Sequence, residues 1–184
     1  VSLHAVFTEI KNIFLGKLLE KQLEFKINFD EKMPKFLLFD ESRLRQILLN
    51  LVGNAIKFTD SGSISLTANV LEHDPKFKMF NIAIVITDTG IGIPEEDHTV
   101  IFESFKQQSG KTSRTFGGTG LGLAISQKLA EMMNGSIEVK SSLNEGSSFT
   151  VTIRGVSMAT AVPAEKSSNG VDYKTIVFNS PKIL

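Results

Sequence analysis

The sequence has 184 residues, of which 41% are hydrophobic and 22% are charged, as in an ordinary water-soluble globular domain. Lys plus Arg and Asp plus Glu both number 20, so the formal net charge is zero and no overall basic field favours nucleic acid. The absence of cysteine excludes disulfides and thiolate metal sites. No apolar run approaches the roughly 20 residues of a membrane span, and no signal peptide is present. We expect a cytoplasmic fragment of a longer protein, which itself could be membrane-anchored.

The first forty residues predict a helix followed by a strand. Apolar residues recur at helical spacing between residues 3 and 21, and Ser2 can cap this helix. The apolar positions are Leu3, Val6, Phe7, Ile10, Ile13, Phe14 and Leu18. Apolar and polar residues then alternate from Leu23 to Phe29, which is typical of a half-buried strand. The apolar run Phe36–Phe39 is too short to assign.

The segment Glu41–Thr59 predicts a helix with two distinct faces, capped by Asp40 or Ser42. One face is broad and apolar, and the other is a narrow polar stripe made of Arg43, Gln46, Asn50, Asn54 and Lys57. Asparagine is a poor helix former, so its presence in the stripe needs a further reason. An amide oxygen can bind Mg²⁺ and a lysine can bind phosphate. The stripe either faces a ligand or is a polar surface, and this helix alone leaves both interpretations open.

The rest of the chain predicts a mixture of strands and helices. Strands are expected at 63–71, 79–87, 136–142 and 147–154, and helices at 95–105 and 121–133, where Leu123, Ile125, Leu129 and Met132 would point inward. The segment 106–116 lacks periodicity and predicts a mobile loop. The packed domain is expected to cover residues 1–155, followed by a linker over 156–184 with one possible edge strand at 173–178. This pattern favours an α+β fold, a two-layer α/β sandwich whose mixed, mostly antiparallel sheet is covered by helices on one face.

Two glycine-containing segments are candidate ligand sites. Asp88 ends an apolar strand and precedes Gly90 and Gly92. Its carboxylate could accept a hydrogen bond from the exocyclic amine of adenine, while the two glycines let the backbone approach the flat ring. A simple Asp-x-Gly turn is the alternative. The run GGTGLG at 117–122 opens a helix, where free backbone N–H groups bind anions, although glycines also serve tight packing. Its spacing fits neither the dinucleotide-binding fingerprint nor a P-loop.

Four segments occur in a specific order: the asparagine helix, a strand ending D-T-G-I-G, the pair Phe102 and Phe105, and G-G-T-G-L-G-L-A-I-S. In this order they resemble the catalytic and ATP-binding domain of sensor histidine kinases, within the GHKL ATPase superfamily, over residues 1–155. The resemblance implies the Bergerat ATP-binding fold. It also implies an enzyme that binds ATP with Mg²⁺ and transfers the γ-phosphoryl group to a histidine on a separate dimerisation domain.

The resemblance also implies a role for each matching residue. Asn54 would coordinate Mg²⁺, Asn50 would contact the phosphates or their metal, and Lys57 would approach the phosphates. Asp88 would bind adenine in a pocket shaped by Gly90, Gly92 and Ile93. Phe102 and Phe105 would lie beside a lid formed by 106–116, from which Lys111 would bind the nucleotide and Arg114 would reach the γ-phosphate. The triphosphate would be wrapped by Gly117, Gly118, Thr119, Gly120, Leu121 and Gly122.

Position 50 bears on the type of reaction. Gyrase, mismatch-repair and heat-shock chaperone relatives carry a glutamate there that activates water, and an amide cannot act as a general base. Asn50 therefore favours transfer to a protein over hydrolysis. None of His4, His73 and His98 has the H-[ED]-x-x-x-P context of an acceptor histidine, so we expect the acceptor domain elsewhere in the same protein. The final residues, Ser180–Leu184, resemble the first strand of a response-regulator receiver domain. A GHKL serine kinase, an ATPase and a non-catalytic nucleotide sensor are the alternatives.

Overall fold

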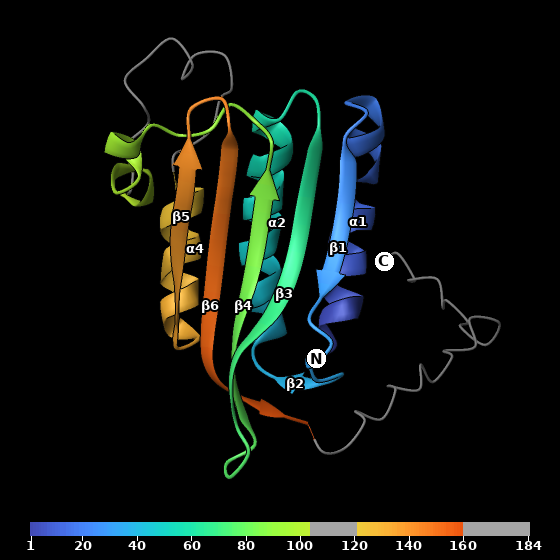
Figure 1. The fold of residues 1–184 in the computed structure, drawn as a ribbon, viewed down its shortest axis with the longest axis vertical. Helices are drawn as coiled ribbons and strands as arrows, with labels where there is room; N and C mark the ends of the chain where they lie inside the picture. Colours follow the sequence, from blue (N-terminus) through green and yellow to red (C-terminus); the bar gives the residue numbers. More distant parts are fainter. Residues whose placement is uncertain (104–120, 160–184) are drawn as a thin grey trace, which may run out of the picture.

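The computed structural model describes residues 1–103 and 121–159. Its strands form one sheet with the order β1-β3-β4-β6-β2, and β5 pairs with β6 (Figure 1). β1 pairs with β3 in parallel and all other neighbours are antiparallel, which confirms the predicted mixed, mostly antiparallel sheet. The strands are β1 (Glu24–Phe29), β2 (Leu37–Leu38), β3 (Ser63–Asp74), β4 (Met79–Asp88), β5 (Gly135–Ser142) and β6 (Gly146–Met158).

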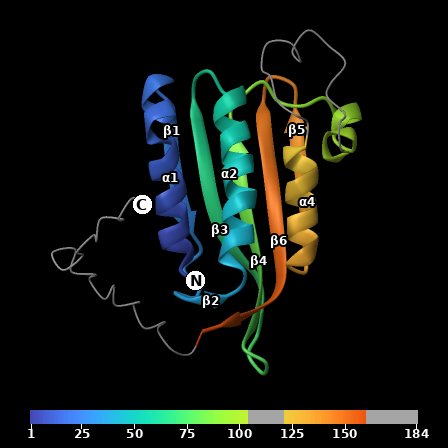
Figure 2. The same ribbon diagram turned by 180° about the vertical axis from the view of Figure 1, so that it is seen from behind.

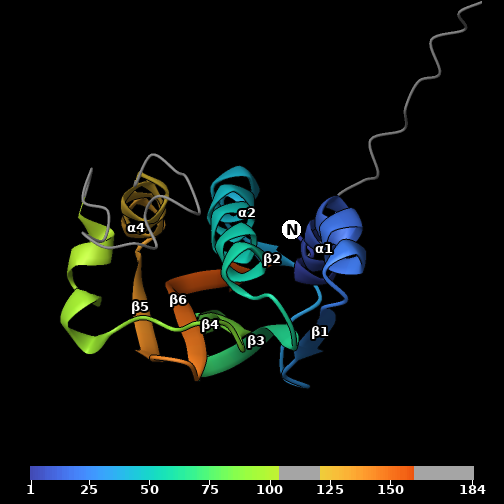
Figure 3. The ribbon, with the colours of Figure 1, turned by 90° about the horizontal axis from the view of Figure 1, so that it is seen from above.

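Within residues 1–103 and 121–159, the helices that cover one face of this sheet are α1 (Leu3–Glu20), α2 (Glu41–Phe58) and α4 (Gly122–Met132). Seen from above, they form one layer and the strands form the other (Figure 3). From behind, α2 lies between α1 and α4 and runs along the sheet (Figure 2). The two-layer α/β sandwich is thereby confirmed. In the described part of the chain, no helix is long and apolar enough to cross a membrane.

The helix ends follow local sequence signals. The Ser2 hydroxyl accepts from the backbone N–H of Ala5 at 3.4 Å, and the Asp40 carboxylate accepts from that of Arg43 at 3.0 Å. Both residues have extended backbone, as N-caps require. Asp40, and not Ser42, is thus the cap of α2. Asn134 ends the α4 region with a φ of 57°.

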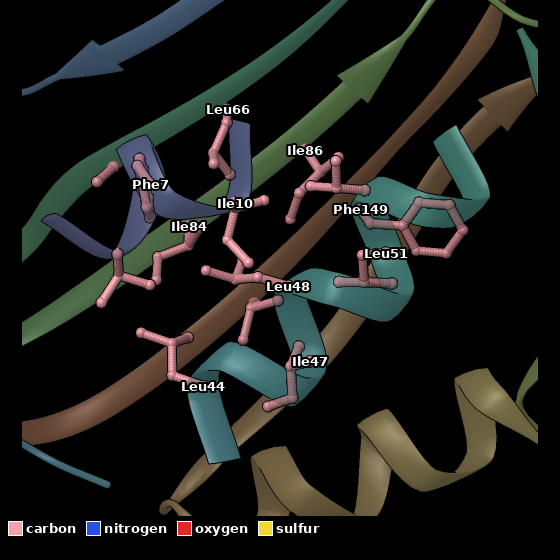
Figure 4. Packing of buried hydrophobic residues seen from close by; sticks show 14 of the residues in the cluster. Phe7, Ile10, Leu44, Ile47, Leu48, Leu51, Leu66, Ile84, Ile86 and Phe149 are labelled. Atoms are coloured by element: carbon pink, nitrogen blue, oxygen red, sulfur yellow. The ribbon is translucent and has the colours of Figure 1, made fainter. Parts of the chain in front are cut away.

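The core lies between α1, α2 and the inner face of the sheet (Figure 4). Phe7 and Ile10 of α1 are fully buried. They pack with an apolar arc of α2 against side chains of β3, β4 and β6, namely Leu44, Ile47, Leu48, Leu51, Leu66, Ile84, Ile86 and Phe149. Because this arc faces the sheet, the polar stripe of α2 is left on the side where α4 and the end of β4 lie.

Several residues expected in the core are exposed. Ile13 of α1 is 53% exposed, and Ile125 and Met132 of α4 are 44% and 56% exposed, so their assignment to inward faces was wrong. In α4 the buried positions are Ser126 and Ala130. α4 packs against α2 and the sheet, so it buries only the narrow stripe of residues that faces both. The small side chains of Ser126 and Ala130 in this stripe allow α4 to approach α2 closely.

The predicted helix at 95–105 is instead two short 3₁₀ turns, η1 (Glu95–Asp97) and η2 (Val100–Phe102), within the residues described. The β-branched run Thr99–Ile101 loses side-chain freedom in an α-helix, which explains why no continuous helix forms. Residues 104 and 105 lie outside the described range.

The strands of the long hairpins exceed their predicted bounds. β3 continues to Asp74, so the first three residues of the expected loop at 72–78 are strand. β6 continues past Gly155 to Met158, and Val156 is 3% exposed. Because β2 pairs with Ser157 and Met158, residues assigned to the start of a linker belong to the sheet. The possible strand at 173–178 and the segment Ser180–Leu184 lie outside the described residues.

Candidate functional site

The polar stripe of α2 lies beside α4. Asn50 and Asn54 are half-buried, one helical turn apart. The Asn50 Nδ2 donates to the hydroxyl of Ser126 at 2.9 Å, which joins α2 to α4. Lys57 is half-buried one turn further on, and its Nζ lies 4.9 Å from the centre of the Phe58 ring. The structure therefore brings the three predicted α2 residues to one edge of the core, next to the start of α4.

Asp88 is the last residue of β4 and is 5% exposed. Its Oδ1 accepts from the backbone N–H of Gly90 at 2.8 Å. Burial raises the pKa of this carboxyl above its usual range, and the backbone hydrogen bonds from Gly90 and Ser147 only partly oppose that rise. The site thus has a fixed hydrogen-bond acceptor in apolar surroundings, suited to a ligand that offers an N–H group.

The loop after Asp88 is held against both neighbouring elements. The backbone N–H of Ile91 donates to the carbonyl of Phe58 at the end of α2 at 3.2 Å. On the other side, the Ile93 N–H donates to the Ser141 hydroxyl of β5 at 2.8 Å. This double attachment fixes the loop between α2 and the β5–β6 turn.

Both glycines of the loop are required by close packing. A Cβ at Gly90 would lie 2.4 Å from the Phe58 carbonyl oxygen, and one at Gly92 would lie 1.9 Å from that of Ser142. Gly92 also has a φ of 69°, a backbone conformation that residues with a side chain rarely adopt. The need for glycine here comes from the approach of the loop to α2 and to the β5–β6 turn.

The first turn of α4 meets the asparagine stripe. A Cβ at Gly122 would lie 2.3 Å from Asn50 Oδ1, so that oxygen lies directly against the helix start. Leu121 precedes the helix and its side chain makes no capping hydrogen bond. The first N–H groups of a helix lack intrahelical acceptors and carry a partial positive charge, so this position suits an anion.

The remaining predicted site residues divide into two groups. Phe102 in η2 is half-buried and packs against the core. Phe105, Lys111, Arg114, Gly117, Gly118, Thr119 and Gly120, together with the predicted lid at 106–116, lie outside the described residues. Sequence reasoning missed Ser126 and Ser141, which contact site residues through their hydroxyls. Ser126 could have been found as the polar residue on the α4 face that carries Ala130.

A magnesium ion would have to be held mainly by amide and ligand oxygens. Within residues 1–103 and 121–159, no group of three or more His, Asp or Glu side chains could hold a metal ion. Asn50 uses its nitrogen for Ser126, so its oxygen is the atom presented at the start of α4. Amide, phosphate and water oxygens are the ligands that Mg²⁺ accepts, so Asn50 and Asn54 fit the ion.

Comparison with known proteins agrees with this geometry. The family model described as "Histidine kinase-, DNA gyrase B-, and HSP90-like ATPase" matches residues 39–156. The hybrid signal transduction histidine kinase K of Dictyostelium discoideum is 35% identical over 182 residues, 96% of this chain and 15% of that protein. The signal transduction histidine-protein kinase BarA of Escherichia coli K12 is 41% identical over 147 residues, 80% of this chain and 16% of that protein. The chain thus spans about 15% of the length of these relatives.

Solved structures share the fold. Full-length ShkA in complex with AMPPNP is 31% identical with a TM-score of 0.73, over 86% of this chain and 31% of that one. The nucleotide-free catalytic domain of the histidine kinase ThkA is 27% identical with a TM-score of 0.68, over 84% of this chain and 95% of that one. The extent of the ThkA match indicates that the chain corresponds to one domain of that kind.

Proposed function

The chain belongs to the histidine kinase-, DNA gyrase B- and HSP90-like ATPase family, as the catalytic, ATP-binding domain of a sensor histidine kinase, and we propose that it binds ATP with Mg²⁺ between α2, α4 and the loop after β4. Its γ-phosphoryl group would pass to a histidine on a separate dimerisation domain of the same protein. A response-regulator receiver domain would be the next acceptor. We further propose that the catalytic unit is the predicted domain of residues 1–155 together with the end of β6 at Met158. We also propose that the segment after it leads to another domain, and that the domain works in the cytoplasm.

One observation supports this proposal most strongly: the site has two chemically different ends. At one end the buried Asp88 carboxyl offers an acceptor for the exocyclic amine of adenine, and the two glycines that follow it let the loop pack closely against α2 and β5. At the other end the Asn50 amide oxygen lies against the start of α4, which suits phosphates. A nucleoside triphosphate likewise has a hydrogen-bonding base at one end and an anionic triphosphate at the other.

The α2 residues would position the triphosphate. Asn50 and Asn54 would offer amide oxygens, and Lys57 would add a positive charge, along one stripe. When bound, Mg²⁺ would neutralise phosphate charge and so favour attack at the γ-phosphorus. Lys111 and Arg114 would add charge from the lid, Phe102 and Phe105 would support it, and Gly117, Gly118, Thr119, Gly120, Leu121 and Gly122 would contact the phosphates.

Transfer to a protein is favoured over hydrolysis by the chemistry at position 50. The Asn50 side chain is an amide whose nitrogen donates to Ser126, and an amide has no basic lone pair with which to deprotonate water. We therefore expect slow intrinsic ATP hydrolysis, and phosphoryl transfer once an acceptor histidine is supplied.

Calorimetry with Mg-ATP tests the site. Asp88→Asn puts an amide nitrogen or a less basic oxygen opposite the adenine amine, so we expect the affinity to fall at least about tenfold. Asn54→Ala should weaken binding only when Mg²⁺ is present. Glu138→Gln, an exposed change on β5, is the matched control and should bind normally. Unchanged affinity in Asp88→Asn would overturn the adenine assignment.

Labelling with γ-phosphate-tagged ATP tests the transfer. We expect no acid-labile product on the chain alone and a labelled histidine when a cognate dimerisation domain is added. An acid-labile product on the isolated chain, or ATP hydrolysis as fast as that of dedicated ATPases, would contradict the proposal.

A further inference from the structure

Ser126 is buried, polar and in contact with the candidate site. It lies one turn into α4 and is 1% exposed, on the same face as the buried Ala130. Burying a hydroxyl costs free energy unless the group is hydrogen-bonded. Its oxygen accepts from Asn50 Nδ2 at 2.9 Å, a contact between residues 76 positions apart. This hydrogen bond is therefore a specific link between two helices.

The hydrogen bond to Ser126 fixes where the Asn50 amide lies, and the start of α4 favours one of the two orientations of that amide. An asparagine side chain can turn over and exchange its oxygen and nitrogen, which have opposite hydrogen-bonding properties. With Nδ2 donating to Ser126, Oδ1 is left on the other side, where it lies 2.3 Å from the position of a Cβ at Gly122. In the opposite orientation the Ser126 hydroxyl could donate to the amide oxygen instead, but an N–H group would then face the partial positive charge at the start of α4, which favours Oδ1 there.

We propose, on the basis of the function proposed above, that Ser126 is a positioning residue: it holds the Asn50 amide oxygen toward the triphosphate and its metal. The same hydrogen bond keeps the start of α4 in register with the α2 stripe. The helix start, which suits phosphate, and the asparagine oxygen, which would hold the metal, thereby stay aligned.

The first readout is selective loss of phosphate binding. In Ser126→Ala the Asn50 amide loses the hydrogen bond that holds it and can rotate away from the start of α4, so we expect the affinity for Mg-ATP to fall about five- to tenfold, the effect of one hydrogen bond. The affinity for adenosine, measured by competition with a labelled ATP analogue, should change less than about twofold because the Asp88 end is untouched. Equal losses for both ligands would mean that Ser126 is merely structural, and no loss would also overturn the proposal.

A double-mutant cycle separates positioning from packing. If Ser126 acts through Asn50, Ser126→Ala should have no further effect on Mg-ATP affinity in an Asn50→Ala background. Ala130→Gly removes a buried methyl group from the same α4 face and is the matched packing control. We expect Ala130→Gly to lower stability but to keep the ratio of Mg-ATP to adenosine affinity. Additive effects of Ser126→Ala and Asn50→Ala would overturn the proposal.

The side-chain amide of Asn50 gives a readout in the wild-type chain. NMR should show one of its two Nδ2 protons protected from exchange with water, and Ser126→Ala should remove that protection. Freely exchanging protons in wild type would refute the inference even if Mg-ATP binds. Absence of Mg-ATP binding by wild type would instead refute the proposed function and leave the amide test standing.

Discussion

The ammonium group of Lys21 lies 3.0 Å from the carbonyl oxygen of Thr59, although the two residues are 38 positions apart. The same group donates to the carbonyls of Ile56 at 3.0 Å and Lys57 at 3.3 Å. These carbonyls lie at the C-terminal end of α2, where the helix supplies no further N–H donors and a positive charge is favourable. Lys21, which follows α1, thus caps the helix that carries the asparagine stripe.

Lys21→Met should destabilise the domain. The substitution keeps most of the aliphatic chain and removes the donor, so we expect the free energy of unfolding to fall by about 1–2 kcal/mol. Urea unfolding followed by circular dichroism measures the change. Lys17→Met, at an exposed position in the last turn of α1, is the matched control and should change stability by less than about 0.5 kcal/mol. Equal midpoints for the two variants would show that the Lys21 contacts contribute nothing.

The pH dependence of stability should reveal the buried Asp88 carboxyl. Burial raises its pKa in the folded state above the unfolded value, so the folded protein binds the proton more tightly. The contribution of Asp88 to stability is therefore fully present below the unfolded pKa and is lost as the pH rises through the raised folded pKa. Between those two values, acidification should stabilise the wild type relative to Asp88→Asn.

Urea unfolding of wild type and Asp88→Asn at a series of pH values from 7 to 4 checks this sign. The difference between the two proteins cancels the other carboxyl groups, which titrate in both. A difference that stays constant, or that moves against the wild type on acidification, would mean that the Asp88 pKa is not raised.

Much of this fold could be predicted because local signals and burial agree. The α2 pattern separates a core arc from a polar stripe, and the structure buries Leu44, Leu48 and Leu51 as the period requires. The Asp40 cap and the Asn134 stop are likewise local. The positions of Asn50 and Asp88 follow from these elements, since each occupies a fixed place on a predicted helix or strand end.

The failures occur where tertiary neighbours decide. Nothing in the period of α4 says that Ser126 is buried and Ile125 exposed, because the choice depends on how close α4 lies to α2. Gly92 could be read as serving a ligand, whereas its immediate constraint is the Ser142 carbonyl oxygen across the loop. Such contacts join residues that are far apart in sequence and carry no local pattern.

Gly16→Ala should stabilise the domain. Gly16 lies within α1, is exposed, and a Cβ there would meet nothing within 4 Å. Alanine is favoured over glycine inside a helix by about 1 kcal/mol, so we expect a gain of about 0.5–1 kcal/mol in the free energy of unfolding. Thermal and urea unfolding measure this gain, and Mg-ATP affinity should stay unchanged. A loss of stability would imply that α1 has a partner at this position.

Gly122→Ala should weaken Mg-ATP binding without a matching loss in the free energy of unfolding. Alanine suits a helix better than glycine, so helix propensity alone predicts a small gain in stability. The new Cβ would, however, lie 2.3 Å from Asn50 Oδ1, which must move and strain its bond to Ser126. We expect Mg-ATP affinity to fall at least about tenfold, as in other losses of a positioned polar group. Calorimetry on Gly122→Ala and Gly16→Ala gives the comparison, because both make the same chemical change in a helix. Wild-type affinity in Gly122→Ala would mean that the Asn50 oxygen is free to leave the start of α4, and that its position there is not needed for binding.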